Sequence, residues 1–148
     1  MSDFIVRPAT REDFTAIRSL IRTVKINPIG LDWKRFIIMV TPEGNLIGCG
    51  QIKCHHDGSQ EMASIAVQEQ SRGRGMARRI IELLLSSNND RPIYLMCRAR
   101  LKGFYLKFGF RPVNIEQMPP YFRRISHLEN IFIQNKQPDD RLMVMCLD

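Results

Sequence analysis

The chain has 148 residues, of which 44% are apolar and 25% charged, and its net charge is +7. This size fits a single domain over residues 1–148 with one buried core, and the composition excludes a disordered chain. Apolar runs are short and the start at Met1 lacks a charged-then-apolar signal, so the sequence excludes a transmembrane helix and favours a cytoplasmic protein without membrane contact.

The first half of the chain predicts a strand, a helix and three further strands, over residues 4–8, 14–24, 36–40, 46–54 and 61–67. The stretch Thr10–Asp13 resembles a capping box in front of the helix, with Asp in the usual place of Glu. Residues 42–45 are typical of a turn, so the second and third strands form a predicted hairpin. The pair Asp57-Gly58 marks the turn into the fourth strand.

The second half predicts three helices that alternate with three strands, over residues 76–85, 93–97, 101–108, 110–113, 119–132 and 142–147. Gly109 suits the C-terminal cap of the short middle helix, and Pro119-Pro120 can open the last one. In that last helix Tyr121, Ile125, Leu128 and Phe132 share one predicted face. The order of elements predicts a mixed α/β fold built on a central sheet.

Four cysteines, Cys49, Cys54, Cys97 and Cys146, form no CxxC pair, and three of them lie in apolar runs. We therefore expect reduced thiols, packed in a cytosolic interior. The run Cys54-His55-His56 has no second cluster to complete a zinc site, so we predict that the protein binds no metal. The three histidines, His55, His56 and His127, are expected to be exposed or to cap the core.

The most informative segment is Glu61–Ala77. Its first part reads as a half-buried strand with Ala63, Ile65 and Val67 on one face, and a Gly-rich turn then opens a helix. Backbone N–H groups at the start of a helix attract phosphate. A Rossmann fingerprint is excluded because Arg78 stands where the third glycine is needed, and a P-loop is excluded because no Lys-Ser or Lys-Thr follows Gly75.

Two motifs in this half of the chain resemble those of one enzyme family. The run Arg72-Gly73-Arg74-Gly75-Met76-Ala77 is similar to the Q/R-x-x-G-x-G/A motif of the GNAT superfamily of N-acetyltransferases. The run Phe104-Tyr105-Leu106-Lys107-Phe108-Gly109-Phe110 looks like the family's F-Y-x-K-x-G-F segment. Both motifs stand in the family order, and the order of strands and helices agrees over nearly the whole chain.

The resemblance implies a GNAT-like α/β (α+β) fold. Its central sheet is mixed and mostly antiparallel, includes a splayed strand pair, and is flanked by about four helices. The implied activity is direct transfer of the acetyl group from acetyl-coenzyme A to a primary amine in a ternary complex. We expect a small-molecule acceptor and no metal. A non-catalytic regulatory module that binds coenzyme A is an alternative.

The resemblance also assigns residues to the cofactor. Small residues let the turn approach the pyrophosphate, and the preceding strand pairs with pantetheine. The implied cofactor-binding residues are Ile65, Ala66, Val67, Arg72, Gly73, Arg74, Gly75, Met76 and Ala77. The N–H of Val67 is expected to polarise the thioester carbonyl. Of Arg72, Arg74, Arg78 and Arg79, we expect two to contact phosphate, with a solvated helix start as the alternative.

Two catalytic residues are implied in the same way. Tyr105 matches the family tyrosine that donates a proton to the sulfur of coenzyme A, while Phe104 and Phe108 are expected in the core. Glu61 stands where several members keep a general base, although a solvated glutamate at the start of a strand explains it equally well. Glu69 is expected to be solvated, and Gln68 to be solvated or to line the substrate cleft.

Other features of the chain keep more than one interpretation. Trp33 suits a wall of the acceptor site or the core. The segment 114–138 suits a lid, a contact in a homodimer or a plain surface helix, and its Arg123 and Arg124 favour an anionic acceptor. The net positive charge also fits a nucleic-acid-binding protein, but the chain has no RNP-like aromatic motif and no helix-turn-helix signature.

Overall fold

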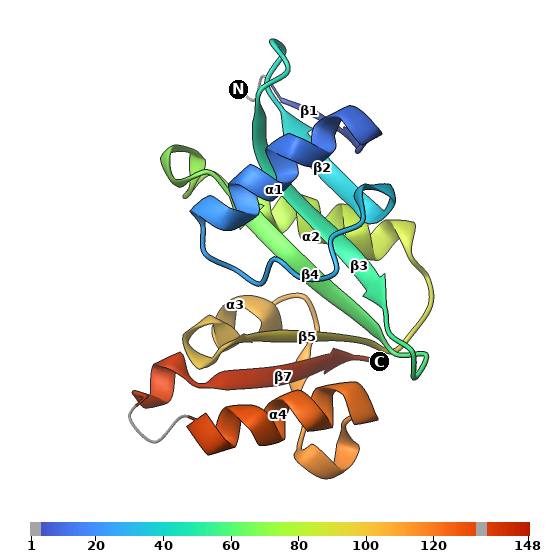
Figure 1. Ribbon diagram of the computed structural model, residues 1–148, viewed down its shortest axis with the longest axis vertical. Helices are drawn as coiled ribbons and strands as arrows, with labels where there is room; N and C mark the ends of the chain where they lie inside the picture. The colour runs from blue at the N-terminus through green and yellow to red at the C-terminus, as the bar shows by residue number, and fades with distance from the viewer. Residues whose placement is uncertain (1–3, 133–135) are drawn as a thin grey trace. The chain divides into compact units, whose positions relative to one another are not determined.

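The computed structural model describes residues 4–132 and 136–148, which form seven strands and four α-helices (Figure 1). The helices are α1 (Phe14–Thr23), α2 (Met76–Ser87), α3 (Lys102–Leu106) and α4 (Pro120–Phe132). The strands are β1 (Ile5–Pro8), β2 (Phe36–Val40), β3 (Leu46–Cys54), β4 (Gln60–Val67), β5 (Ile93–Arg98), β6 (Arg111–Pro112) and β7 (Leu142–Leu147). The predicted order of elements is confirmed.

The strands join in the order β1-β2-β3-β4-β5-β7-β6. The β1–β2, β2–β3, β5–β7 and β6–β7 pairs are antiparallel, whereas β4 and β5 are parallel. This confirms a mixed, mostly antiparallel sheet with four helices. The chain divides into two units, residues up to Lys53 with Met62–Asn89, and Cys54–Glu61 with Asp90–Asp148, so that β4 contributes to both.

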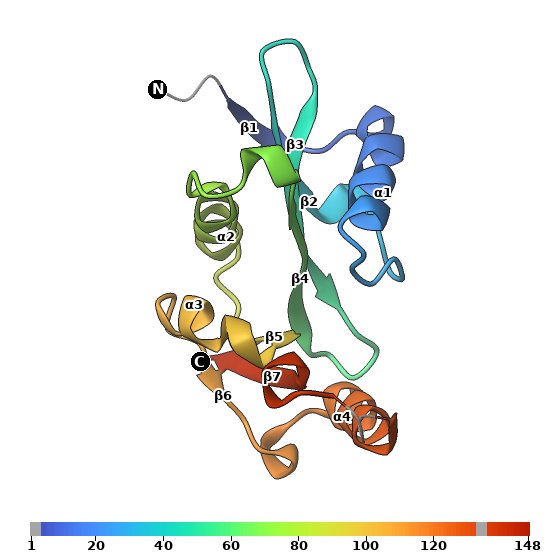
Figure 2. The same ribbon diagram turned by 90° about the vertical axis from the view of Figure 1, so that its left-hand side faces the viewer.

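In the first unit, α1 and α2 cover opposite faces of the strands β1 to β4 (Figure 2). The capping box predicted before α1 is present, since the carboxylate of Asp13 accepts the Thr10 N–H at 2.7 Å and also binds Arg7. The buried stripe of α1, Ile17, Leu20 and Ile21, packs in one core with Phe36, Ile38, Val40, Cys49 and Ala66. The helical spacing of the apolar residues therefore sets which face of α1 meets the sheet.

The packing of α2 on the sheet depends on two glycines of β3. A Cβ atom on Gly50 would lie 2.6 Å from Ile65 Cδ1 and 2.9 Å from Ile80 Cγ2. A Cβ atom on Gly48 would lie 2.9 Å from Ile80 Cδ1. The missing side chains let Ile80 of α2 rest directly on the strand, which is a close approach that only glycine allows.

In the second unit, α3 and α4 lie on opposite sides of β5 and β7 (Figure 2). Phe122 of α4 is fully buried, and with Met118 and Val144 it forms a core to which Tyr94 and Met96 add. The predicted apolar face of α4 is wrong in one respect, because Leu128 is 55% exposed. Phe122 takes the buried position instead, and the side chain of Phe132 lies outside the described residues.

All four cysteines are free; Cys49, Cys97 and Cys146 are buried, and Cys54 is exposed. This agrees with the expectation of reduced, packed thiols. Burial raises the pKa of Cys49 to about 12 and that of Cys97 to about 11. No helix in the described part of the chain is long and apolar enough to span a bilayer.

We expect Gly50→Ala to lower the free energy of unfolding by about 1–3 kcal/mol, because overpacking displaces the neighbouring side chains. Gly103→Ala in α3 is the control, since a Cβ atom there would meet nothing within 4 Å. Alanine favours a helix, so the control is expected to be neutral or slightly stabilising. Urea unfolding measures both changes, and equal midpoints for the two variants would contradict the packing argument.

Candidate active site

The Gly-rich turn links the end of β4 to α2. Gly73 and Gly75 have φ angles of 83° and 77°, and Gly75 is the residue directly before the helix. A Cβ atom on either glycine would meet nothing within 4 Å, so the requirement for glycine is conformational rather than steric. Arg72 Nε donates to the Val67 carbonyl at 3.2 Å, which ties the turn back to the strand.

A hollow of about 280 Å³ lies at the start of α2. Its lining includes three of the four arginines that the sequence analysis expected near phosphate. The lining residues are Arg74, Arg78, Arg79, Gly75, Met76, Phe4, Met39 and Glu82. Guanidinium groups and the positive end of the helix dipole meet there. The hollow is therefore suited to a phosphate group.

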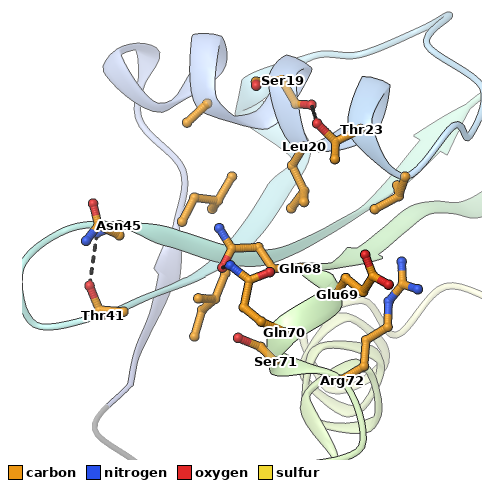
Figure 3. A pocket seen from close by; sticks show the side chains of 14 residues that line it. Ser19, Leu20, Thr23, Thr41, Asn45, Gln68, Glu69, Gln70, Ser71 and Arg72 are labelled. Carbon is orange, nitrogen blue, oxygen red and sulfur yellow. Dashed lines mark hydrogen bonds between the residues drawn. The ribbon is translucent and has the colours of Figure 1, made fainter.

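A larger pocket of about 750 Å³ lies on the α1 side of the same turn (Figure 3). Gln68–Arg72 form one wall, and residues of α1 and of the β2–β3 turn, such as Thr23 and Asn45, form the others. Gln68 thus lines a cleft, while Glu69 is exposed, as expected. Neither Glu61 nor Tyr105 lines this pocket, so its size alone does not make it the place of reaction.

β4 contains an unusual backbone conformation at Ser64, whose φ angle is 61°. A left-handed residue inside a strand is typical of a bulge, which bends the strand and redirects its side chains. Gln51 Nε2 donates to Ser64 Oγ at 2.9 Å, and Cys49 Sγ lies 3.5 Å from the Ser64 carbonyl. Ala66 packs in the α1 core, whereas Ile65 and Val67 approach the two β3 glycines on the α2 face.

Both faces of β4 are covered, since the adjacent residues Glu61 and Met62 are buried, as are Ala66 and Val67. Of the three residues predicted to share one face, Ile65 and Val67 both approach the β3 glycines.

Glu61 is buried, with only 4% of its surface exposed. This excludes the alternative of a solvated glutamate. His55 Nε2 lies 2.8 Å from Glu61 Oε1, a contact that the sequence analysis missed. A signal was present, since the Asp57-Gly58 turn separates the two residues and brings their strand ends together. His55 is thus neither freely exposed nor simply a cap of the core.

Two aromatic residues of α4 contact the imidazole of His55. Tyr121 stacks on it with ring centroids 3.5 Å apart and planes 15° apart, and Phe122 meets it edge-on at 5.7 Å. Asp57 Oδ2 accepts the N–H of Tyr121 at 3.0 Å and so binds the first turn of α4. Hydrogen bonds from Ser59, together with that of Tyr121, lower the pKa of Asp57 to about 2. The N-terminal end of the 114–138 segment is therefore packed against the β3–β4 turn.

Tyr105 is 9% exposed and lies in α3. Its ring meets Phe104 and Phe110 edge-on at 5.1 and 6.2 Å. Burial raises the pKa of Tyr105 to about 12, and the Cys97 thiol adds to the rise, so the hydroxyl keeps its proton at neutral pH. Phe104 and Phe108 are only half-buried, and Phe110, 1% exposed, fills the core position that the sequence analysis gave to them.

Two polar side chains of β3 hold the segment between α1 and β2. Lys53 Nζ donates to the Ile29 carbonyl at 3.1 Å, and Gln51 Nε2 lies 3.3 Å from the Gly30 carbonyl. Both side chains are buried, and the sequence analysis had passed over them as part of a hairpin strand. Trp33, in the same segment, is half-buried.

The remaining candidates lie at the surface or bind locally. Arg123 Nη2 donates to the Met118 carbonyl at 2.8 Å, and Arg124 is exposed. His56 and His127 are exposed, as expected. Within residues 4–132 and 136–148, no group of three or more His, Cys, Asp or Glu side chains could hold a metal ion.

Comparison with known proteins identifies the family. The model of the acetyltransferase (GNAT) domain matches residues 32–112. Glucosamine 6-phosphate N-acetyltransferase 1 of Oryza sativa subsp. japonica is 29% identical over 126 residues, which cover 78% of this chain and 72% of that protein.

Solved structures show the same fold. Rv2747 from Mycobacterium tuberculosis, in complex with CoA and NLQ, superposes with a TM-score of 0.75 at 19% identity, covering 97% of this chain and 98% of that one. N-acetylglutamate synthase from Neisseria gonorrhoeae, complexed with coenzyme A and N-acetyl-glutamate, gives a TM-score of 0.73 at 18% identity, covering 100% of this chain and 36% of that one. With the family match over residues 32–112, the chain belongs to the GNAT family and is an acetyl-CoA-dependent N-acetyltransferase.

Proposed function

We propose that this protein transfers the acetyl group of acetyl-CoA directly to the primary amine of a small molecule, in a ternary complex, with residues 1–148 acting as one domain. The observation that carries the proposal is the buried carboxylate of Glu61. It lies on β4, the strand that leads through Val67 into the Gly-rich turn. A buried base on the strand that feeds the phosphate-binding turn suits proton removal from an amine.

The Gly-rich turn is proposed to hold the pyrophosphate of acetyl-CoA. The N–H groups from Gly73 to Ala77 supply donors at the start of α2, and Arg74 lines the adjacent hollow. Arg72 already binds the Val67 carbonyl through Nε and shapes the turn from within. The backbone of Ile65–Val67 is proposed to pair with the pantetheine arm, and the left-handed backbone at Ser64, just before it, supports this as a departure from regular strand geometry.

Three groups of the chain are proposed to carry the reaction. Glu61 takes a proton from the incoming ammonium group, which makes the amine a nucleophile. The N–H of Val67 donates to the oxygen on which negative charge develops. Tyr105 gives its proton to the sulfur that leaves, and its raised pKa keeps that proton in place until the thiolate forms.

The acceptor is proposed to be small and anionic. The rice relative is named for glucosamine 6-phosphate, which has both an amine and a phosphate group. The net charge of +7 and the exposed Arg124 favour a negatively charged substrate. Arg123 is less suited than the sequence analysis expected, because its guanidinium already binds the Met118 carbonyl.

Gly75→Ala is expected to weaken acetyl-CoA binding about tenfold, because a side chain at a left-handed position costs roughly 1–2 kcal/mol and distorts the turn. Gly44→Ala is the matched control, since Gly44 also has a positive φ, 93°, and open space around it, but lies in the β2–β3 turn. Isothermal titration gives both affinities. Equal affinities for the two variants would remove the turn from the binding site.

Tyr105→Phe is expected to lower kcat about 100-fold while the Kd of acetyl-CoA stays unchanged, because only the proton donor is lost. Steady-state rates and titration separate the two quantities. Since the pKa of Tyr105 is about 12, a loss of activity at alkaline pH below 10 has to come from another group. A variant that keeps the kcat of the parent protein would exclude Tyr105 as the acid.

Paired acceptors test the substrate class. Glucosamine 6-phosphate is compared with glucosamine, and an amino acid with its amide, each at saturating acetyl-CoA. We expect kcat/KM to be about tenfold or more higher for the anionic member, the effect of one charge-assisted hydrogen bond. Faster acetylation of lysine-containing peptides than of any small amine would overturn the proposed acceptor class without affecting coenzyme binding.

A further inference from the structure

The side chain of His55 contacts the carboxylate of Glu61. Its Nε2 lies 2.8 Å from Glu61 Oε1, and the side chains are 13% and 5% exposed. A carboxylate removed from water needs such a partner, because a buried charge without one is strongly disfavoured.

The imidazole is held in one orientation from both sides. Tyr121 stacks on its face at 3.5 Å, and the fully buried Phe122 meets it edge-on. Tyr121 is itself fixed, since its N–H donates to Asp57 in the turn that follows His55. The ring of His55 therefore points Nε2 at Glu61 without having to search for that geometry when substrate binds.

We propose that His55 is a positioning residue for acetyl transfer, which binds the carboxylate of Glu61 and orients it toward the amine. With its proton on Nε2, a neutral imidazole donates to Oε1 and leaves Oε2 to take the proton of the ammonium group. This role rests on the proposed function, in which Glu61 is the base, and adds the group that makes a buried glutamate an effective one.

The arrangement also predicts how the reaction depends on pH. The titratable groups that face His55 are Glu61 on β4, Asp57 in the turn and Tyr121 on α4, and Tyr94 of β5 pairs with Glu61 across the parallel ladder. A hydrogen bond to a carboxylate favours its charged form, so removal of a donor acts on the acidic limb of a pH profile.

The test compares His55→Leu with the parent enzyme over pH 5–9. We expect the acidic limb of kcat/KM for the amine to move up by about one pH unit, while the Kd of acetyl-CoA is unchanged. His55→Gln, whose amide N–H can reach Glu61, is expected to restore most of the profile. His56→Leu is the matched control, because His56 is adjacent and exposed, and its profile should equal that of the parent enzyme.

Two outcomes would overturn the inference. One is a His55→Leu profile that superposes on that of the parent enzyme. The other applies if the leucine variant does not fold. His55→Gln is then compared with His55→Asn, whose amide is too short to reach Glu61. Equal pH profiles of kcat/KM for these two variants would exclude a positioning role.

Glu61→Gln separates this inference from the function on which it rests. If that variant keeps full activity, Glu61 is not the base, and the proposed mechanism fails. If it is inactive while every His55 variant behaves like the parent enzyme, the base is right and only the role of His55 is wrong. Titration with acetyl-CoA confirms in each case that the variant protein is folded.

Discussion

The left-handed backbone at Ser64 is the constraint on which the site depends. A serine in this conformation costs roughly 1–3 kcal/mol, so it persists only where its surroundings compensate. Gln51, from the neighbouring strand, supplies part of that compensation through its hydrogen bond to Ser64 Oγ. Before this residue β4 buries Glu61; after it Ile65 and Val67 approach the β3 glycines on the α2 face, while Ala66 packs in the α1 core.

A buried carboxylate at Glu61 also requires a hydrogen-bond donor. Residues of α4, which are distant in the sequence, hold that donor in place. The carboxylate needs a donor, His55 supplies one, and the ring of His55 is fixed by Tyr121 and Phe122. The helix that contains these aromatic residues is bound through Asp57 to the same turn that places His55 next to Glu61. Turn, helix and carboxylate thus stabilise one another, and a change in one of them acts on the others.

The sequence predicted the elements of this fold well because their signals are local. Helical spacing set α1 and α2, turn residues separated β2 from β3, and the two motifs marked the start of α2 and the helix with Tyr105. The contacts around Glu61 were missed because they join residues that no periodicity relates. His55 is six positions from Glu61 and meets it only across the hairpin, and Tyr121 is sixty residues further on.

Packing errors in the sequence analysis have the same origin. Phe122 is buried in the core with Val144, whereas Leu128 is 55% exposed, and the first turn of α4 is also anchored through Asp57. Gly48 and Gly50 give a second example. Glycine usually destabilises a strand, but here the two glycines leave the space in which Ile80 of α2 packs. Local propensity predicts which element forms, whereas the rotation of that element is set by partners distant in sequence.

The segment between α1 and β2 shows how a loop can be held without fixing its side chains. Lys53 and Gln51 reach it through the carbonyl groups of Ile29 and Gly30, so the anchors are backbone atoms that any residue would provide. The side chain of Ile29 is 74% exposed and takes no part in this anchoring. Substitutions at such a position change the surface that the segment presents, while the two β3 side chains keep the path of its backbone, so surface chemistry and loop position can vary separately.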